Sequence, residues 1–188
     1  VTAGFNDKTT STYFGHTGYD LGGSGMHDIY PILPGKVVAI ETNPDKNGNG
    51  IVVVVEHKTP DGHIFYSSYS HLSEIEDVDH IVGKEVGTGT LIGQRGSTGI
   101  GNKAYHLHLA VFTAPENPDK GLLTDPAGYA SGDKETTFEK AEGCIYNEYY
   151  CITSRKNGKW KEHTYYDVYL VMLTNGGIID LYPRPKNI

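Results

Sequence analysis

Residues 104–111 read AYHLHLAV and place two histidines, His106 and His108, in an otherwise apolar run. Successive side chains of a β-strand point to opposite faces, so both histidines would project from the same face. Leu107 and Leu109 would then lie on an apolar face, with the period of two that indicates a half-buried strand. The pattern predicts a strand. It leaves open whether the histidines bind a ligand or only form the polar face.

The composition of the whole chain favours strands and turns. Its 188 residues include 24 glycines and 14 tyrosines, and aromatic and β-branched residues favour strands whereas glycine favours turns. The length suits one domain, or one domain with a small appendage. A formal net charge of −7 argues against binding nucleic acid through net charge. No apolar run approaches the ~20 residues of a membrane-spanning helix.

Further strands are predicted on both sides of several turns. The segments GKVVAIE (35–41), IVVVVEH (51–57) and IFYSSYSHL (64–72) have strand character, and the last two are spaced as a hairpin. Residues 83–102 contain short apolar pieces among glycines, which predicts a loop, a strand and a second loop. The best helix candidate is a short piece over 136–141. The expected fold class is therefore mainly β.

The character of the sequence changes after about residue 130, where short strands and turns follow one another. This part could be a small β appendage or could add strands to the main sheet. It contains Cys144 and Cys151, the only cysteines. Without paired CxxC motifs, a structural zinc knuckle is not indicated. The two cysteines could form a small disulfide if the protein is exported, or stay as free thiols.

Two more segments supply side chains that could meet the histidines of AYHLHLAV. HTGYD (16–20) carries His16 and Asp20, and YSHL (69–72) places His71 near a strand end. Histidine and carboxylate are good zinc ligands, and a catalytic zinc site uses three protein ligands. His16, Asp20 and one histidine of the HxH pair would fill three positions. Two histidines would remain for proton transfer.

The motifs HTGYD, YSHL, IGQRGSTG and YHLHL, in this order and at these separations, resemble the lysostaphin-type (LytM-like) zinc metallopeptidases. The resemblance covers roughly residues 13–113. It implies an antiparallel β-sheet core with glycine-rich loops around a zinc groove. The expected domain spans 1–130, and a β-rich extension of unknown role spans 131–188, which could pack as part of the same domain. The family's usual HLHFE ending is HLHLA here.

The resemblance also assigns roles. His16, Asp20 and His108 match the ligands of Zn²⁺, and His71 and His106 match two catalytic histidines near the metal, with the general base left open between them. None of these five positions is substituted.

The implied activity is a zinc-dependent endopeptidase that hydrolyses peptide bonds of bacterial peptidoglycan, in stem peptides or cross-bridges. Its expected location is extracellular, periplasmic or cell-wall associated. The alternative is an inactive or weakly active peptidoglycan-binding module that activates other wall hydrolases. The usual mark of that alternative, loss of zinc ligands, is missing from this sequence. The oligomeric state is left open.

Other polar residues receive simpler predictions. Glu56 and His57 are expected to flank a turn as polar groups at the end of a buried strand. Tyr66 and Tyr69 are expected to pack in the core, although a tyrosine beside the metal is the open alternative. Thr98 is expected to serve the turn before HxH, with substrate contact as its alternative.

Overall fold

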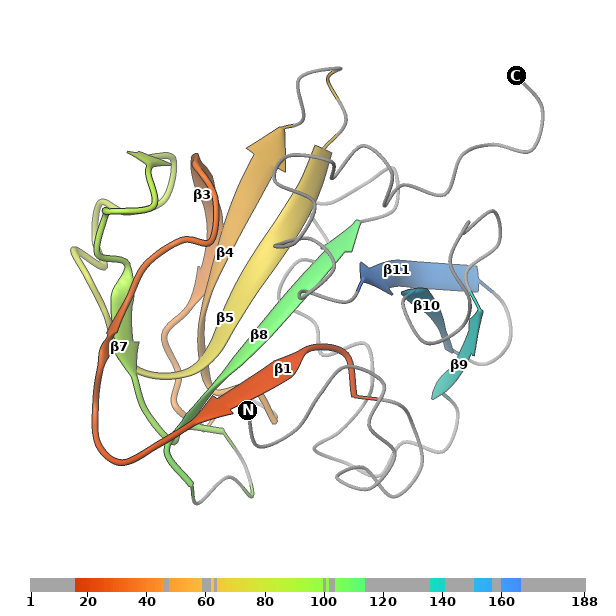
Figure 1. Cartoon of the computed structure of the whole chain (residues 1–188), viewed down its shortest axis with the longest axis horizontal. Helices are drawn as coiled ribbons and strands as arrows, with labels where there is room; N and C mark the ends of the chain where they lie inside the picture. Colours follow the sequence, from red (N-terminus) through yellow and green to blue (C-terminus); the bar gives the residue numbers. More distant parts are fainter. Residues whose placement is uncertain are drawn as a thin grey trace.

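The computed structural model shows a mainly antiparallel β-sheet, which confirms the predicted fold class (Figure 1). The structure describes residues 16–45, 48–58, 62, 64–99, 101 and 104–113, together with the backbone of three later strands. Nothing in this described part forms a helix long and apolar enough to cross a membrane. In chain order the strands are β1 Tyr19–Gly22, β2 Asp28–Ile29, β3 Gly35–Glu41, β4 Ile51–Lys58, β5 Ile64–Ile75, β6 Glu85–Val86, β7 Gly93–Arg95, β8 His106–Thr113, β9 Thr136–Lys140, β10 Cys151–Lys156 and β11 Trp160–Tyr166.

The centre of the sheet is the run β3-β4-β5-β8. Strand β4 is a series of β-branched residues, which pack well on a pleated surface. Val53 and Val55 face one apolar cluster, and Val52 and Val54 face a second cluster on the opposite side. Burying one such side chain contributes about 1.5–3 kcal/mol. The predicted hairpin of β4 and β5 is confirmed, and it gives the site a rigid support.

Strand β8 brings the motifs together. One edge of β8 pairs with β5, where Ser70 lies opposite His108. The other edge is shared, because β1 pairs with its first half and β11 pairs with its second half. Figure 1 shows β1 and β5 on opposite sides of β8. The HxH half of β8 therefore lies between the strand that contains YSHL and the strand that begins within HTGYD.

The C-terminal strands continue the sheet in the order β11-β10-β9. Strand β11 pairs with β8, for example Tyr165 with Phe112. The division of the chain into domains at residue 130 stays a prediction. The helix expected over 136–141 is wrong, because β9 occupies this position and pairs with β10. Threonines and a phenylalanine in TTFEK favour a strand. Cys144 lies outside the described residues, so the disulfide stays a prediction.

Candidate metal centre

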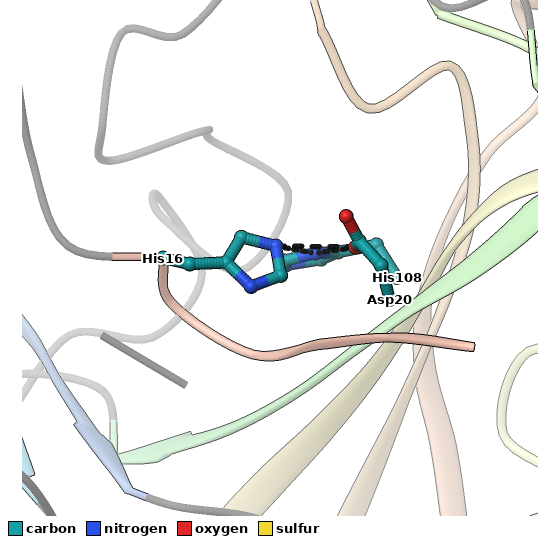
Figure 2. Close-up of side chains that lie close together, drawn as sticks. All are labelled: His16, Asp20 and His108. Atoms are coloured by element: carbon teal, nitrogen blue, oxygen red, sulfur yellow. Dashed lines mark hydrogen bonds and ion pairs between the residues drawn. The ribbon is translucent and has the colours of Figure 1, made fainter. Parts of the chain in front are cut away.

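Three of the predicted ligands converge on one point, as Figure 2 shows. The Nε2 atom of His16 lies 3.1 Å from Oδ1 of Asp20 and 3.0 Å from Nδ1 of His108. The third side of the triangle, from Nδ1 of His108 to Oδ1 of Asp20, measures 3.0 Å. Strand pairing explains the approach, because Asp20 and His108 are direct partners in the ladder of β1 and β8.

Glycine at position 18 permits this arrangement of HTGYD. A Cβ atom on Gly18 would lie 2.2 Å from the carbonyl oxygen of Leu109, closer than any side chain can approach. The chain between His16 and Asp20 therefore lies directly against β8. This close approach places His16 within reach of His108.

The triangle fits a divalent metal ion. In a tetrahedral zinc site the ligand distances of about 2.0–2.1 Å place ligand atoms about 3.3 Å apart, close to the spacing found here. A cation between the three atoms would satisfy all of them at once, whereas shared protons can serve only some of the three contacts. Two imidazoles and a carboxylate form a donor set that zinc prefers, and other divalent metals also accept it.

The electrostatics of the triangle favour the forms of Asp20 and His108 that bind metal. Burial alone would raise the pKa of Asp20, but hydrogen bonds from His108 and His16 lower it overall. Burial lowers the pKa of His108, which outweighs its contact with Asp20. A metal needs an ionised carboxylate and neutral imidazoles. Thr17 adds an outer contact, since its Oγ1 lies 3.4 Å from Nε2 of His108.

His71 reaches the site through an irregularity in β5. The strand uses one more residue than β4 does between the pairs Val53–Tyr69 and Ile51–Leu72, which is a β-bulge. His71 has a φ of 63°, in the left-handed region that non-glycine residues rarely adopt. Because of this step, Leu72 joins the same core cluster as Tyr69. The bulge thereby turns the side chain of His71 toward β8. Bulges beside functional sites often redirect a side chain in this way.

His71 and His106 form a pair next to the triangle. Their ring centroids lie 4.4 Å apart, and Nε2 of His106 is 3.8 Å from Oδ1 of Asp20. In each ring Nδ1 faces a carbonyl oxygen and must carry the proton, 2.8 Å from Thr98 O for His71 and 2.9 Å from Ala104 O for His106. Nε2 is then the basic atom of both rings. Burial, followed by repulsion from the neighbouring histidines, lowers the pKa of His71 to about 3.

Thr98 holds His71 in place, a role that neither prediction for this residue included. Besides the carbonyl contact, its hydroxyl donates to Leu72 O at 2.7 Å and accepts from the Ile51 amide at 3.0 Å. The next residue, Gly99, has a φ of 107°, and a Cβ there would lie 2.2 Å from the carbonyl oxygen of Gly48. The GSTG loop is thus clamped between the turn before β4 and the bulge of β5.

The remaining predictions are settled by burial. Tyr66 and Tyr69 pack in the core at 5% and 1% exposure, as predicted. The prediction for His57 is wrong, because this residue is 2% exposed and not a turn-flanking group. Its hydrogen-bond partners Pro34 and Ser67 come from other segments, so local sequence gave no signal of its burial.

An antiparallel β-sheet with a His-Asp-His triangle and an adjacent histidine pair has the features of a metal-dependent hydrolase site. The profile of Peptidase family M23 matches residues 14–120, which is more than half of the chain. The chain therefore belongs to Peptidase family M23. All five residues of the triangle and the pair lie within the matched range. No curated protein matches the chain in sequence.

Solved structures give partial matches. A protein from Pseudomonas aeruginosa assigned to peptidase M23 is 33% identical over 51% of this chain and 37% of its own, with a TM-score of 0.42. The catalytic domain of the antimicrobial peptidase lysostaphin from Staphylococcus simulans is 31% identical over 52% and 66%, with a TM-score of 0.42. A zinc-containing peptidase from Vibrio cholerae is 28% identical over 58% and 32%, with a TM-score of 0.47. The chain thus spans only about a third of the length of the first and last of these proteins.

Proposed function

We propose that this protein is a zinc-dependent endopeptidase that hydrolyses peptide bonds of bacterial peptidoglycan, in stem peptides or cross-bridges. The observation that carries the proposal is the convergence of His16, Asp20 and His108 beside the pair of His71 and His106. Membership of Peptidase family M23 supports peptide hydrolysis. The proposed location is extracellular, periplasmic or associated with the cell wall, where this substrate lies.

The triangle of His16, Asp20 and His108 would hold the zinc ion. Zinc, when bound, supplies Lewis acidity that polarises a carbonyl group and makes water acidic enough to lose a proton near neutral pH. Asp20 contributes the negative charge of the site, and its lowered pKa keeps it ionised across the physiological range. The two histidine ligands contribute neutral nitrogens.

The proposed role of His71 and His106 is proton transfer. Their Nδ1–H groups are tethered to backbone carbonyls, so each ring is fixed in one orientation and presents Nε2. In the proposed mechanism the pair takes a proton from the attacking water and returns it to the leaving amine. Positioned acid–base groups of this kind typically accelerate a reaction by about 10²–10⁴-fold.

The test is a digest of purified peptidoglycans of several wall types, analysed by mass spectrometry with and without a chelator. We expect fragments with new amine ends that disappear with the chelator and return when zinc is added. Asp20→Ala should bind no zinc and release no fragments. Asp79→Ala, which changes an exposed aspartate of the same chain, should behave like wild type.

A zinc-loaded protein that cleaves no wall would contradict the proposal. If that protein instead stimulated a second wall hydrolase, the binding and regulatory alternative would replace it. Activity that persists in a metal-free Asp20→Ala protein would also contradict the proposal, because the triangle would then not be the active centre.

A further inference from the structure

Arg95 is a buried cation that the proposed mechanism does not use. It ends β7 and is only 8% exposed. Among the described residues no carboxylate pairs with its guanidinium, whose partners are all backbone carbonyls. A buried charge is costly unless polar groups compensate for it. An apolar side chain would fill the same space without this cost, so the charge calls for an explanation.

The carbonyls belong to one short segment, Leu21–His27. The Nη2 atom of Arg95 donates to Gly25 O at 3.0 Å and to Ser24 O at 3.1 Å. Nε reaches Gly25 O at 3.3 Å and Nη1 reaches Leu21 O at 3.4 Å. The Arg95 amide also donates to His27 O at 2.8 Å. A planar fork with several donors can order a turn of chain in this way, which a single ammonium group cannot do.

Gly23 lies against the same guanidinium. A Cβ on Gly23 would be 3.1 Å from both Nη atoms, so the segment wraps closely around the side chain. Figure 1 shows the chain after β1 running past β7 on its way to β3. The segment therefore packs around Arg95, which donates hydrogen bonds to the carbonyl oxygens of Leu21, Ser24, Gly25 and His27.

Arg95 is also connected to the elements that carry the site. Its ladder partner in β5 is Leu72, which follows His71. The next residue, Gly96, forms a bridge with His106. The segment that Arg95 holds begins beside Asp20, and Gly22 within it lies opposite His106. The start of the segment thus lies beside His106.

We infer that Arg95 is a positioning residue, whose guanidinium holds Leu21–His27 as a wall that contacts the substrate beside His106. This inference rests on the proposed peptidase function. Residues 20–22 are fixed separately, because Asp20 and the two residues after it pair with residues 106–108 in the ladder of β1 and β8. The part of the wall beyond Gly22 can therefore loosen while the metal ligands stay in place, and substrate binding should suffer more than catalysis or metal binding.

The test compares Arg95→Met and Arg95→Lys with wild type, with Lys36→Met as the control at an exposed cation. Arg95→Lys keeps the positive charge but lacks the planar fork of donors. It therefore tests the same inference if Arg95→Met fails to fold. Three quantities are measured: hydrogen exchange of the 21–27 amides in the metal-free protein, zinc affinity, and kcat and KM on a soluble peptide that contains the bond cleaved in the peptidoglycan digest.

In both Arg95 variants we expect faster exchange over 23–27 and a KM raised on the order of 10-fold. The kcat and the zinc affinity should stay close to wild type, which is the pattern of lost substrate binding. Unchanged exchange would overturn the inference, as would a fall in kcat and zinc affinity with KM unchanged. If wild type cleaves no peptide, the proposed function fails on its own, while the exchange measurement still decides whether Arg95 holds the segment.

Discussion

Two histidines of the central hairpin, His57 on β4 and His71 on β5, have similar local environments. They differ in the hydrogen bonding of Nε2. Both are buried, at 2% and 9% exposure. Both donate Nδ1–H to a backbone carbonyl, at 2.9 Å to Pro34 and at 2.8 Å to Thr98. Burial lowers the pKa of both. Residue type, burial and one hydrogen bond therefore do not separate a structural histidine from a candidate catalytic one.

The difference lies at Nε2. In His57 this atom is 2.7 Å from Ser67 Oγ, and Ser67 Oγ is 3.0 Å from the hydroxyl of Tyr69. Because Nδ1 of His57 carries the proton, Nε2 accepts the single proton of Ser67. The Tyr69 hydroxyl then donates to Ser67 and accepts from the Ile32 amide at 2.8 Å. The chain of hydrogen bonds is closed, and every buried group in it is satisfied.

In His71, by contrast, Nε2 forms no hydrogen bond with any residue that the structure describes, and the ring faces His106. The backbone differs as well, because His71 has a φ of 63° whereas His57 lies in regular strand. Left-handed backbone at such a residue costs about 1–3 kcal/mol and is typical of functional sites. A left-handed backbone and an Nε2 atom without a hydrogen bond to any described residue distinguish His71, in the candidate site, from His57, in the core.

The largest effect is expected for His71→Asn. Asparagine tolerates the left-handed region, so the variant should keep a free energy of unfolding within about 1 kcal/mol of wild type. It lacks the basic nitrogen, so peptidoglycan hydrolysis should fall by about 100-fold or more with zinc still bound. The measurements are fragment release by mass spectrometry, zinc content and urea unfolding. His80→Asn, at an exposed histidine, is the control, and full activity in the His71 variant would refute the assignment.

His57→Ala should produce the opposite result. It removes a buried ring, the acceptor of the Ser67 hydroxyl proton and the donor to Pro34 O, which should cost about 2–4 kcal/mol of stability. Because His57 lies outside the candidate site, the folded fraction should cleave with wild-type kcat. Urea unfolding and kinetics on the refolded fraction check this pair of outcomes. A stable variant with reduced kcat would mean that the core histidine takes part in function.

The same comparison shows what the sequence could predict. Strand β4 follows from its run of valines, and the strand predicted on residues 104–111 follows from alternation, because both patterns are local. Ligand chemistry suggested that His16, Asp20 and one histidine of HxH meet, and the resemblance of motifs selected His108. The ladder of β1 and β8 supplies the physical reason. No local pattern shows which strands become neighbours.

Long-range hydrogen bonds explain the predictions that failed or were not made. His57 looked like a turn-flanking residue, because its partners Pro34 and Ser67 lie 23 and 10 positions away. The sequence did not single out Arg95, because the carbonyls that its guanidinium binds lie 70 or more positions away. Such contacts follow from tertiary packing and cannot be predicted from composition or periodicity.

The smallest expected effect is a pH dependence of stability that belongs to His57. Burial lowers its pKa in the folded protein below the ordinary value of 6.5. Above that value both states are neutral at this residue, so its contribution is fully present. As the pH falls below about 6.5 the unfolded chain binds a proton that the folded protein does not, so stability is lost, by at most about 1.4 kcal/mol per pH unit for one group.

The measurement is urea unfolding of metal-free wild type and His57→Asn at pH 7.5 and pH 5.5. Asparagine can still donate to the Pro34 carbonyl but does not titrate, so the variant should lose less stability between the two pH values than wild type does. His71 and the carboxylates titrate in both proteins, and their contributions cancel in the difference. An equal loss in the two proteins would mean that His57 is protonated in the folded state, and the closed chain through Ser67 and Tyr69 would then have to be replaced by a different arrangement.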